Sequence, residues 1–148
     1  MSVVDLDLPL FTETAENEFF GLPMEMVRTV GFKGEAIGGT RARVRMPHNK
    51  AFTNSRGDMH GGMIATLFDA ALSAACRAHD PRKFGVVTID LTIHFMAPGS
   101  ADMICHAVCE RRGKSISFAR GEIRNDAGEL LGMATGTFKL MERGVAQA

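Results

Sequence analysis

One long apolar helix, set between strand-like segments, constrains this chain more than any other feature. From about His60 to His79 the apolar residues recur at three- and four-residue spacing, which predicts a helix with one buried face. Asp80-Pro81 ends the segment, because the residue before a proline avoids helical backbone angles. The stripe consists of Ile64, Leu67, Phe68, Ala71, Leu72 and Ala75. A stripe of this length needs a large apolar surface to cover it, which indicates a sheet.

The segments on either side of the helix predict strands. They span residues 24–33, 36–46, 86–95, 101–110, 115–124 and 130–140. Gly34 marks a tight turn between the first two, and Asn125 to Gly128 a hairpin turn before the last. Apolar and polar residues alternate cleanly from Val86 to Phe95, as they do in a strand with one buried face. Residues 12–20, with threonines and acids suited to a helix start, predict a short helix.

This order of elements predicts an α+β fold. We expect a single domain over residues 1–148, with an ordered core at about residues 20–140. One antiparallel sheet would lie against the long helix.

Charge and cysteine content exclude several classes of function. The chain has 17 basic and 17 acidic residues, so a strongly basic face for nucleic acid is not expected. It contains no apolar run of about 18 residues, and its acidic start differs from a secretory signal, so we expect no membrane association. Cys76, Cys105 and Cys109 form no C-x-x-C pair. They suit buried thiols in a reducing, cytoplasmic setting rather than disulfides or structural zinc.

Two features of the long helix point to chemistry. Gly61 and Gly62 lie at its start, where backbone N–H groups lack helical partners and where no Cβ blocks a ligand. The Gly61 N–H is therefore suited to polarise a carbonyl group, although such glycines also permit close packing on a sheet. Asp69 lies on the flank of the apolar stripe among small or apolar neighbours, where an unpaired carboxylate is costly. A carboxylate in such a place needs a functional reason, unless it is a salt-bridged or solvent-facing helix residue.

The spacing HGG-x6-Asp, which joins His60–Gly62 to Asp69, resembles the hotdog-fold acyl-CoA thioesterases. Asn54, six residues before the histidine, adds to the resemblance, and the phenylacetate-pathway and 4-hydroxybenzoyl-CoA thioesterases are the most similar group. The resemblance covers about residues 20–140. It implies a hotdog fold, in which a curled antiparallel sheet of five to six strands wraps around one long central helix, here with a short N-terminal helix.

The resemblance also implies a shared active site. Asp69 would be the general base or the nucleophile and would face the Gly61 amide of a partner subunit across a dimer interface. The alternatives of base and nucleophile are not separated by the sequence. We therefore expect a homodimer, or two dimers that form a tetramer.

Other residues are assigned supporting roles by the same resemblance. Asn54 would hold its amide near the thioester or the attacking water, while His60 and Gly62 shape the site. Ser73 and Thr88 would position water beside the carboxylate, unless their hydroxyls only bond the local backbone.

Coenzyme A is expected to contact a basic turn and a strand start. Family members often place Arg, Lys and Ser against its phosphates, and here the turn supplies Arg112, Gly113, Lys114 and Ser115. A plain solvated hairpin is the alternative. The residues expected to line the channel for the pantetheine arm are Phe84, Gly85, Val86 and Pro98.

Hydrolysis of an acyl-CoA thioester, without a metal or other cofactor, is the activity that we expect. Two rivals stay open: a non-catalytic acyl-CoA-binding or regulatory hotdog domain, and a hotdog enoyl-CoA hydratase or dehydratase. "HFMAPG", from His94 to Gly99, faintly resembles the His-Phe-Pro signature of dehydratases. It departs from that signature at its first proline, and it follows the helix instead of preceding it.

Overall fold

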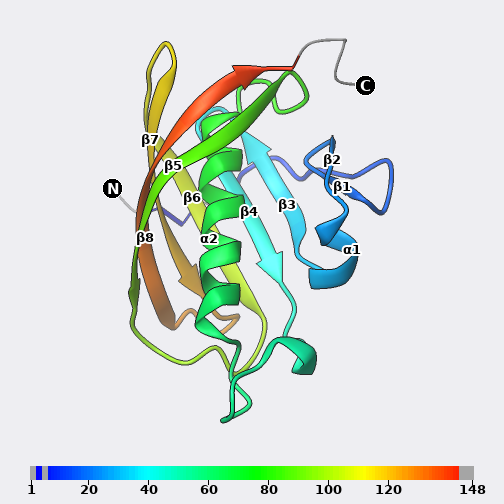
Figure 1. The fold of residues 1–148 in the computed structure, drawn as a ribbon, viewed down its shortest axis with the longest axis vertical. Helices are drawn as coiled ribbons and strands as arrows, with labels where there is room; N and C mark the ends of the chain where they lie inside the picture. Colours follow the sequence, from blue (N-terminus) through cyan, green and yellow to red (C-terminus); the bar gives the residue numbers. More distant parts are fainter. Residues whose placement is uncertain (1–2, 5–6, 144–148) are drawn as a thin grey trace.

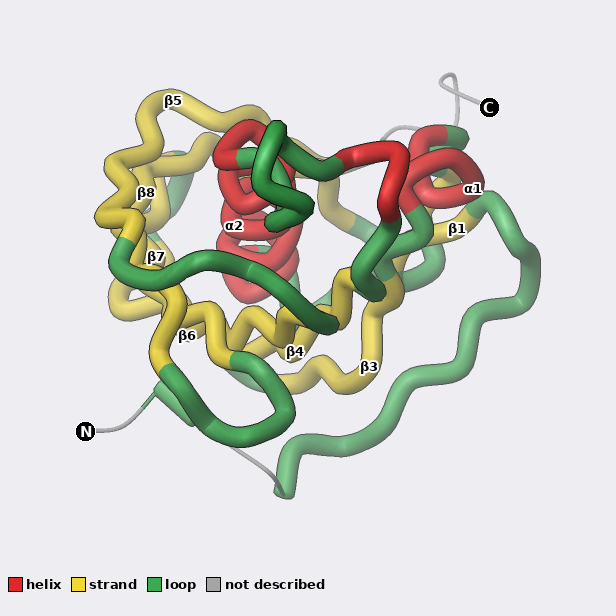
Figure 2. The backbone as a smooth tube through the Cα atoms, turned by 90° about the horizontal axis from the view of Figure 1, so that it is seen from below, coloured by secondary structure: helices red, strands yellow, loops and turns green. Residues whose placement is uncertain are grey.

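A curled antiparallel sheet wraps around a single long helix in the computed structural model, which describes residues 3–4 and 7–143 (Figure 1). The helix is α2 (Gly61–Cys76). The six strands follow the order β3-β4-β6-β7-β8-β5 across the sheet. They are β3 (Lys33–Gly38), β4 (Arg41–Met46), β5 (Phe84–Phe95), β6 (Met103–Arg112), β7 (Ile116–Arg124) and β8 (Leu130–Glu142). Seen along α2, the strands succeed one another around the helix (Figure 2).

The core lies between α2 and the concave face of the sheet. Every residue of the predicted apolar stripe is buried, together with Ala70, Ala74 and Cys76. Small residues let the helix come close: a Cβ on Gly121 of β7 would lie 2.7 Å from a Leu72 methyl group. The helix ends at Cys76, three residues before the predicted end, and the Arg77 N–H closes its last turn on the carbonyl groups of Ser73 and Ala74. The predicted α+β arrangement is thus confirmed.

The sheet is not closed, and β5 forms one of its edges. The alternation in this strand predicts one buried face, but Val87, Ile89 and Phe95 are each more than half exposed. A bulge between Thr88 and Asp90 interrupts the register with β8, and among the described residues β5 has no neighbour on its other side. An edge position cannot be inferred from alternation alone.

The helix predicted over residues 12–20 is wrong. Residues Glu18–Phe19 instead form β1, which pairs with β2 (Leu22–Pro23) in a two-stranded sheet. The acids bind backbone outside any helix, since both carboxylate oxygens of Glu13 accept the Gly21 N–H at 3.2 Å. Phe19 and Phe20 are both buried, and Phe20 adopts a φ of 47°. Burial of two consecutive aromatic rings overrides the local preference for a helix.

The predicted strand over residues 24–33 and the predicted turn at Gly34 are also wrong. A short helix, α1 (Met26–Val30), occupies this stretch and ends at Gly31, whose φ of 82° suits glycine. The strand turn lies at Gly39, with a φ of 59°, between β3 and β4. Gly34 instead belongs to β3. Packing requires glycine at this position, because a Cβ there would lie 2.5 Å from the ring of Phe20.

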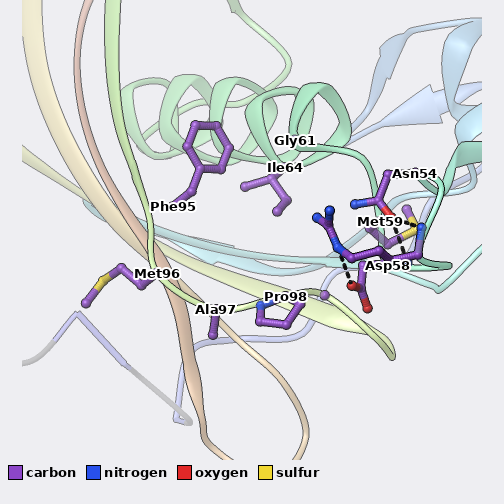
Figure 3. A pocket seen from close by; sticks show the side chains of 11 residues that line it. Asn54, Asp58, Met59, Gly61, Ile64, Phe95, Met96, Ala97 and Pro98 are labelled. Carbon is purple, nitrogen blue, oxygen red and sulfur yellow. Dashed lines mark hydrogen bonds and ion pairs between the residues drawn. The ribbon is translucent and has the colours of Figure 1, made fainter.

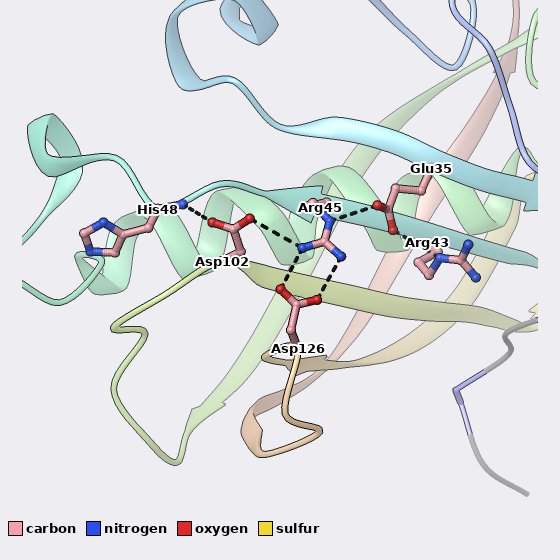
Figure 4. A network of polar contacts seen from close by, with 6 residues as sticks. All are labelled: Glu35, Arg43, Arg45, His48, Asp102 and Asp126. Carbon is pink, nitrogen blue, oxygen red and sulfur yellow. Dashed lines mark hydrogen bonds and ion pairs between the residues drawn. The ribbon is translucent and has the colours of Figure 1, made fainter.

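The convex face of the sheet carries a network of ion pairs (Figure 4). Arg45 of β4 contacts Glu35 at 2.9 Å, Asp126 at 3.0 Å and Asp102 at 3.4 Å. Asp102 also accepts the His48 N–H. Hydrogen bonds that Arg45 donates to Asp126 and Glu35 raise its pKa above the ordinary value. β4 thus turns its arginine-bearing face away from α2.

Cys76, Cys105 and Cys109 are buried and form no disulfide. Across the residues that the structure describes, no helix has the length and apolar character needed to cross a membrane.

Candidate active site

The amino end of α2 leaves one backbone donor unpaired. His60 caps the helix, because its Nδ1 accepts the Gly62 N–H at 2.9 Å. The His60 carbonyl accepts the N–H groups of Met63 and Ile64, as a first helical turn requires. Within the described chain, the Gly61 N–H has no acceptor. It therefore points the positive end of the helix at whatever binds there.

His60 is a capping residue in this geometry. Its Nδ1 is occupied as an acceptor, so the ring proton belongs on Nε2. A ring fixed in this way shapes the start of the helix. Gly62 shares that task, since a Cβ on it would lie 3.2 Å from the same ring nitrogen.

Asn54 organises the loop that leads into the helix. Its Oδ1 accepts the N–H groups of Arg56 and Asp58 at 2.9 and 3.2 Å, and its own N–H donates to the Asp58 carbonyl. Gly57 allows the tight turn with a φ of 84°. With Oδ1 committed to the loop, the Nδ2 group of Asn54 is the part of the side chain available to a ligand.

A cavity of about 340 Å³ opens beside the Gly61 backbone (Figure 3). The Asn54–Asp58 loop forms one side, and the end of β5 with the segment after it forms the other. The lining residues include Asn54, Arg56, Asp58, Met59, Gly61, Ile64, Phe95, Met96, Ala97 and Pro98. A Cβ on Gly61 would meet Phe95 at 3.5 Å, an ordinary contact, so packing inside this chain does not require glycine at this position.

Asp69 and Thr88 form a second polar pair, away from this cavity. Thr88 Oγ1 of β5 donates to Asp69 Oδ1 at 2.6 Å, which fixes the half-buried carboxylate against the strand. Eight residues separate Asp69 from Gly61, which corresponds to about 12 Å along the helix axis. The two groups cannot reach one thioester carbon from the same chain. Ser73 Oγ donates to the Ala70 carbonyl, within its own helix.

The residues expected to bind coenzyme A are divided between the two ends of α2. Pro98 lines the cavity at the amino end. Phe84 lies at the carboxyl end, where the His79 ring stacks on it with 4.8 Å between centroids. Gly85 and Val86 line a smaller cavity of about 250 Å³, together with the end of β8.

The basic turn after β6 lies at the carboxyl end of α2. Arg112 is committed to that end: its guanidinium donates to the carbonyl groups of Cys76 at 3.0 Å, Ala75 at 3.3 Å and Gly39 at 2.9 Å. Gly113 has a steric role, because a Cβ there would lie 2.2 Å from the Ile116 carbonyl oxygen. Lys114 and Ser115 are exposed.

Sequence reasoning missed Phe95 and Arg56 as residues of the cavity. Phe95 was counted in the alternating face of its strand, and only the edge position of β5 makes it accessible. Arg56 could have been found from the sequence, because it lies two residues after Asn54 in the loop of the motif. Its side chain is largely exposed and faces Asp58 at 3.7 Å. No cluster of three or more His, Cys, Asp or Glu suited to a metal ion occurs among the described residues.

Comparisons with known proteins identify the family of the chain. The family model of the thioesterase superfamily matches residues 56–131, about half of the chain. A Halobacterium salinarum protein provisionally named an esterase is 34% identical over 95 residues, which are 61% of this chain and 63% of that protein. Acyl-coenzyme A thioesterase 13 of Mus musculus is 31% identical over 75 residues, 49% of this chain and 53% of that protein. The match thus spans less than two thirds of either relative.

Solved structures share most of the arrangement of elements. A conserved protein of Pseudomonas aeruginosa superposes with a TM-score of 0.73 and 25% identity, over 78% of this chain and 92% of that one. The PaaI protein of the Escherichia coli phenylacetic acid degradation operon superposes with a TM-score of 0.71 and 23% identity, over 78% of this chain and 83% of that one. A Bacillus halodurans protein crystallised with CoA superposes with a TM-score of 0.70 and 26% identity, over 81% of this chain and 78% of that one. These likenesses confirm the predicted hotdog fold.

Proposed function

The chain belongs to the thioesterase superfamily, and we propose that it hydrolyses an acyl-CoA thioester to a free acid and coenzyme A. The observation that carries the proposal is the unpaired Gly61 N–H, which lies at the start of α2 beside an open cavity. Thioester hydrolysis needs such a donor where the carbonyl oxygen becomes negatively charged.

The Gly61 N–H would donate to the thioester carbonyl oxygen. The helix dipole adds to the positive potential at this point, so the donor stabilises the tetrahedral intermediate more than the ground state. A preorganised donor of this kind typically lowers the barrier by roughly 3–4 kcal/mol. The Asn54 amide, from the adjoining loop, would hold the thioester or the attacking water.

Asp69 supplies the carboxylate of the reaction. As a general base it takes a proton from water while the oxygen attacks the carbonyl carbon; the C–S bond then breaks and the thiolate leaves. As a nucleophile it attacks directly and forms a mixed anhydride, which water hydrolyses. The hydrogen bond from Thr88 leaves Oδ2 for either task. Ser73, one turn further along α2, would hold water beside it. Neither route uses a metal or other cofactor.

We propose that two copies of the chain complete each site. The separation of about 12 Å between Gly61 and Asp69 supports this, because one substrate can contact both only if they come from different chains. Gly62, Thr66, Asp69 and Ser73 form a partly exposed stripe on α2, on which the partner's α2 would lie. The exposed apolar residues Val87 and Ile89 on edge strand β5 support the same contact. A dimer of dimers is the larger assembly that we expect.

Coenzyme A would extend from the cavity of one chain to the carboxyl end of the partner's α2. Pro98 would contact the pantetheine arm first, followed by Phe84, Gly85 and Val86 of the other chain. Lys114 and Ser115, both exposed, would meet the phosphates, while Arg112 and Gly113 hold the turn in place. The CoA-bound Bacillus halodurans relative supports this class of ligand. A cytoplasmic setting is part of the proposal, and three free thiols support it.

Replacement of Asp69 tests the activity. We expect Asp69→Asn to lower kcat for thiol release by about 10²–10⁴-fold, because it removes the base or nucleophile and keeps the shape. Binding of acyl-CoA, measured by calorimetry, should persist. Asp80→Asn, the same change at an exposed aspartate beyond the helix, is the matched control. A wild-type protein that binds acyl-CoAs and hydrolyses none would be a binding domain, and one that hydrates enoyl-CoA would be a hydratase.

A further inference from the structure

Phe95 is the most exposed of the phenylalanines in the described chain, followed by Phe118 at 46%. Phe19, Phe20, Phe32, Phe68 and Phe138 are at most 1% exposed. Phe95 is 58% exposed, at the last position of edge strand β5. A ring left open to this degree loses most of the free energy that its burial would supply. The exposed ring is available to contact something outside the chain.

The Phe95 ring lies against the proposed carbonyl site. Its Cε1 atom would be 3.5 Å from a Cβ on Gly61, so ring and backbone border the same space. Figure 3 shows the side chain extending from β5 toward the first turn of α2, above Ile64. A carbonyl group bound to the Gly61 N–H thus places one of its two substituents, the acyl chain or the thiol arm, beside Phe95.

The residues that line the cavity indicate that the substituent beside Phe95 is the acyl chain and not the thiol arm. Ile64, Ala97 and Pro98 line the cavity together with Phe95, whereas Asn54, Arg56 and Asp58 lie together on its polar side (Figure 3). A hydrocarbon chain matches the apolar side. The pantetheine arm has two amide groups, which would lose their hydrogen bonds to water there and find no partners.

The cavity is also limited in size. Its volume of about 340 Å³ lies at the lower end of the range for small-molecule pockets, roughly 300–1,000 Å³. A short acyl group fits beside the ring, but a long chain must pass it. The Phe95 ring thus limits how far an acyl chain can extend in the cavity.

We infer that Phe95 determines the length of the acyl group that the site accepts. The inference rests on the proposed thioesterase function and adds a specificity-determining residue to it. A smaller side chain at this position opens the cavity toward longer chains, and a larger one closes it.

A panel of straight-chain acyl-CoAs from butanoyl to hexadecanoyl, read by thiol release, tests this inference. For Phe95→Ala, we expect the ratio of kcat/KM for long over short chains to rise at least fivefold above that of wild type. For Phe95→Trp, the ratio should fall. Phe118→Ala is the matched control, because Phe118 is 46% exposed on β7 and lies outside the cavity; its ratio should stay unchanged. If Phe95→Ala unfolds, Phe95→Leu removes less side-chain volume and should raise the same kcat/KM ratio to a smaller degree.

The outcomes separate the two proposals. A wild-type protein that hydrolyses no member of the panel overturns the thioesterase function and, with it, this inference. An active wild type whose chain-length ratio is the same in Phe95→Ala and Phe95→Trp overturns the inference alone. Light scattering on the same samples adds a further check: an altered oligomeric state with an unaltered ratio would assign the ring to a subunit interface instead.

Discussion

The two ends of α2 differ in whether their free backbone groups have hydrogen-bond partners. At the carboxyl end, Arg112 donates to the Cys76 and Ala75 carbonyl groups. Arg77, buried beside them, donates to the Phe19, Phe20 and Pro81 carbonyls. At the amino end, the Gly61 N–H stays unpaired and opens onto a cavity. One end of the helix is thus bound into the fold, and the other is left for a ligand.

Burial explains why the carboxyl end needs two arginines. Arg77 is almost fully buried, and desolvation lowers its pKa to about 10, which still leaves the guanidinium charged near neutral pH. Its carbonyl partners belong to the β1 region, so it fixes the N-terminal segment on the helix. Unsatisfied carbonyl groups in such a place would cost free energy with no functional return.

Among changes at the two ends of α2, removal of the Gly61 donor should have the largest effect on the reaction. Gly61→Pro deletes the N–H, and proline is well accepted at the first position of a helix. His60 already has a ψ of 143°, which a following proline favours. We expect kcat to fall about 10²–10³-fold, with an unchanged melting temperature.

Gly61→Ala is the matched control for that change. It keeps the donor and adds only a Cβ at ordinary contact distance from Phe95. It should raise KM by crowding the cavity and retain far more of kcat than the proline variant. Equal losses of kcat in both variants would mean that shape, and not the donor, matters at this end.

Removal of the Arg112 cap should change stability and leave the chemistry nearly intact. Arg112→Ala frees the carbonyl groups of Cys76, Ala75 and Gly39, and we expect it to lower the free energy of unfolding by about 2 kcal/mol. Urea unfolding measures this. Lys114→Ala, on the exposed tip of the same turn, should change that free energy by less than about 0.5 kcal/mol and instead raise KM for acyl-CoA. The reverse pattern would make Arg112 the phosphate ligand.

The sequence predicted those parts of the molecule that its periodic patterns determine. The stripe of α2 and the alternation in the later strands depend on contacts between neighbours in one element, so they were visible in the chain. The N-terminal third was not. Its conformation depends on Phe19 and Phe20 packing together, and on Gly34 making room for Phe20, which are contacts between distant residues.

The site was predictable only as far as the motif extends. The spacing of His60, Gly61 and Asp69 located the helix start and the carboxylate. It gave no information about Phe95, whose exposure follows from the order of strands in the sheet. Nor did it separate Arg112 from Lys114, because both are basic and only the folded chain brings one of them to the end of α2.

The central claim is that one chain supplies Gly61 and the other supplies Asp69, and subunit complementation tests it most directly. Asp69→Asn and Gly61→Pro chains, each nearly inactive alone, are mixed in equal amounts, unfolded and refolded together. Random pairing makes half of the dimers mixed, each with one intact site of two, so our account predicts about a quarter of wild-type activity. A mixture that stays as inactive as its components would contradict the account, because it would place both groups of each site in a single chain.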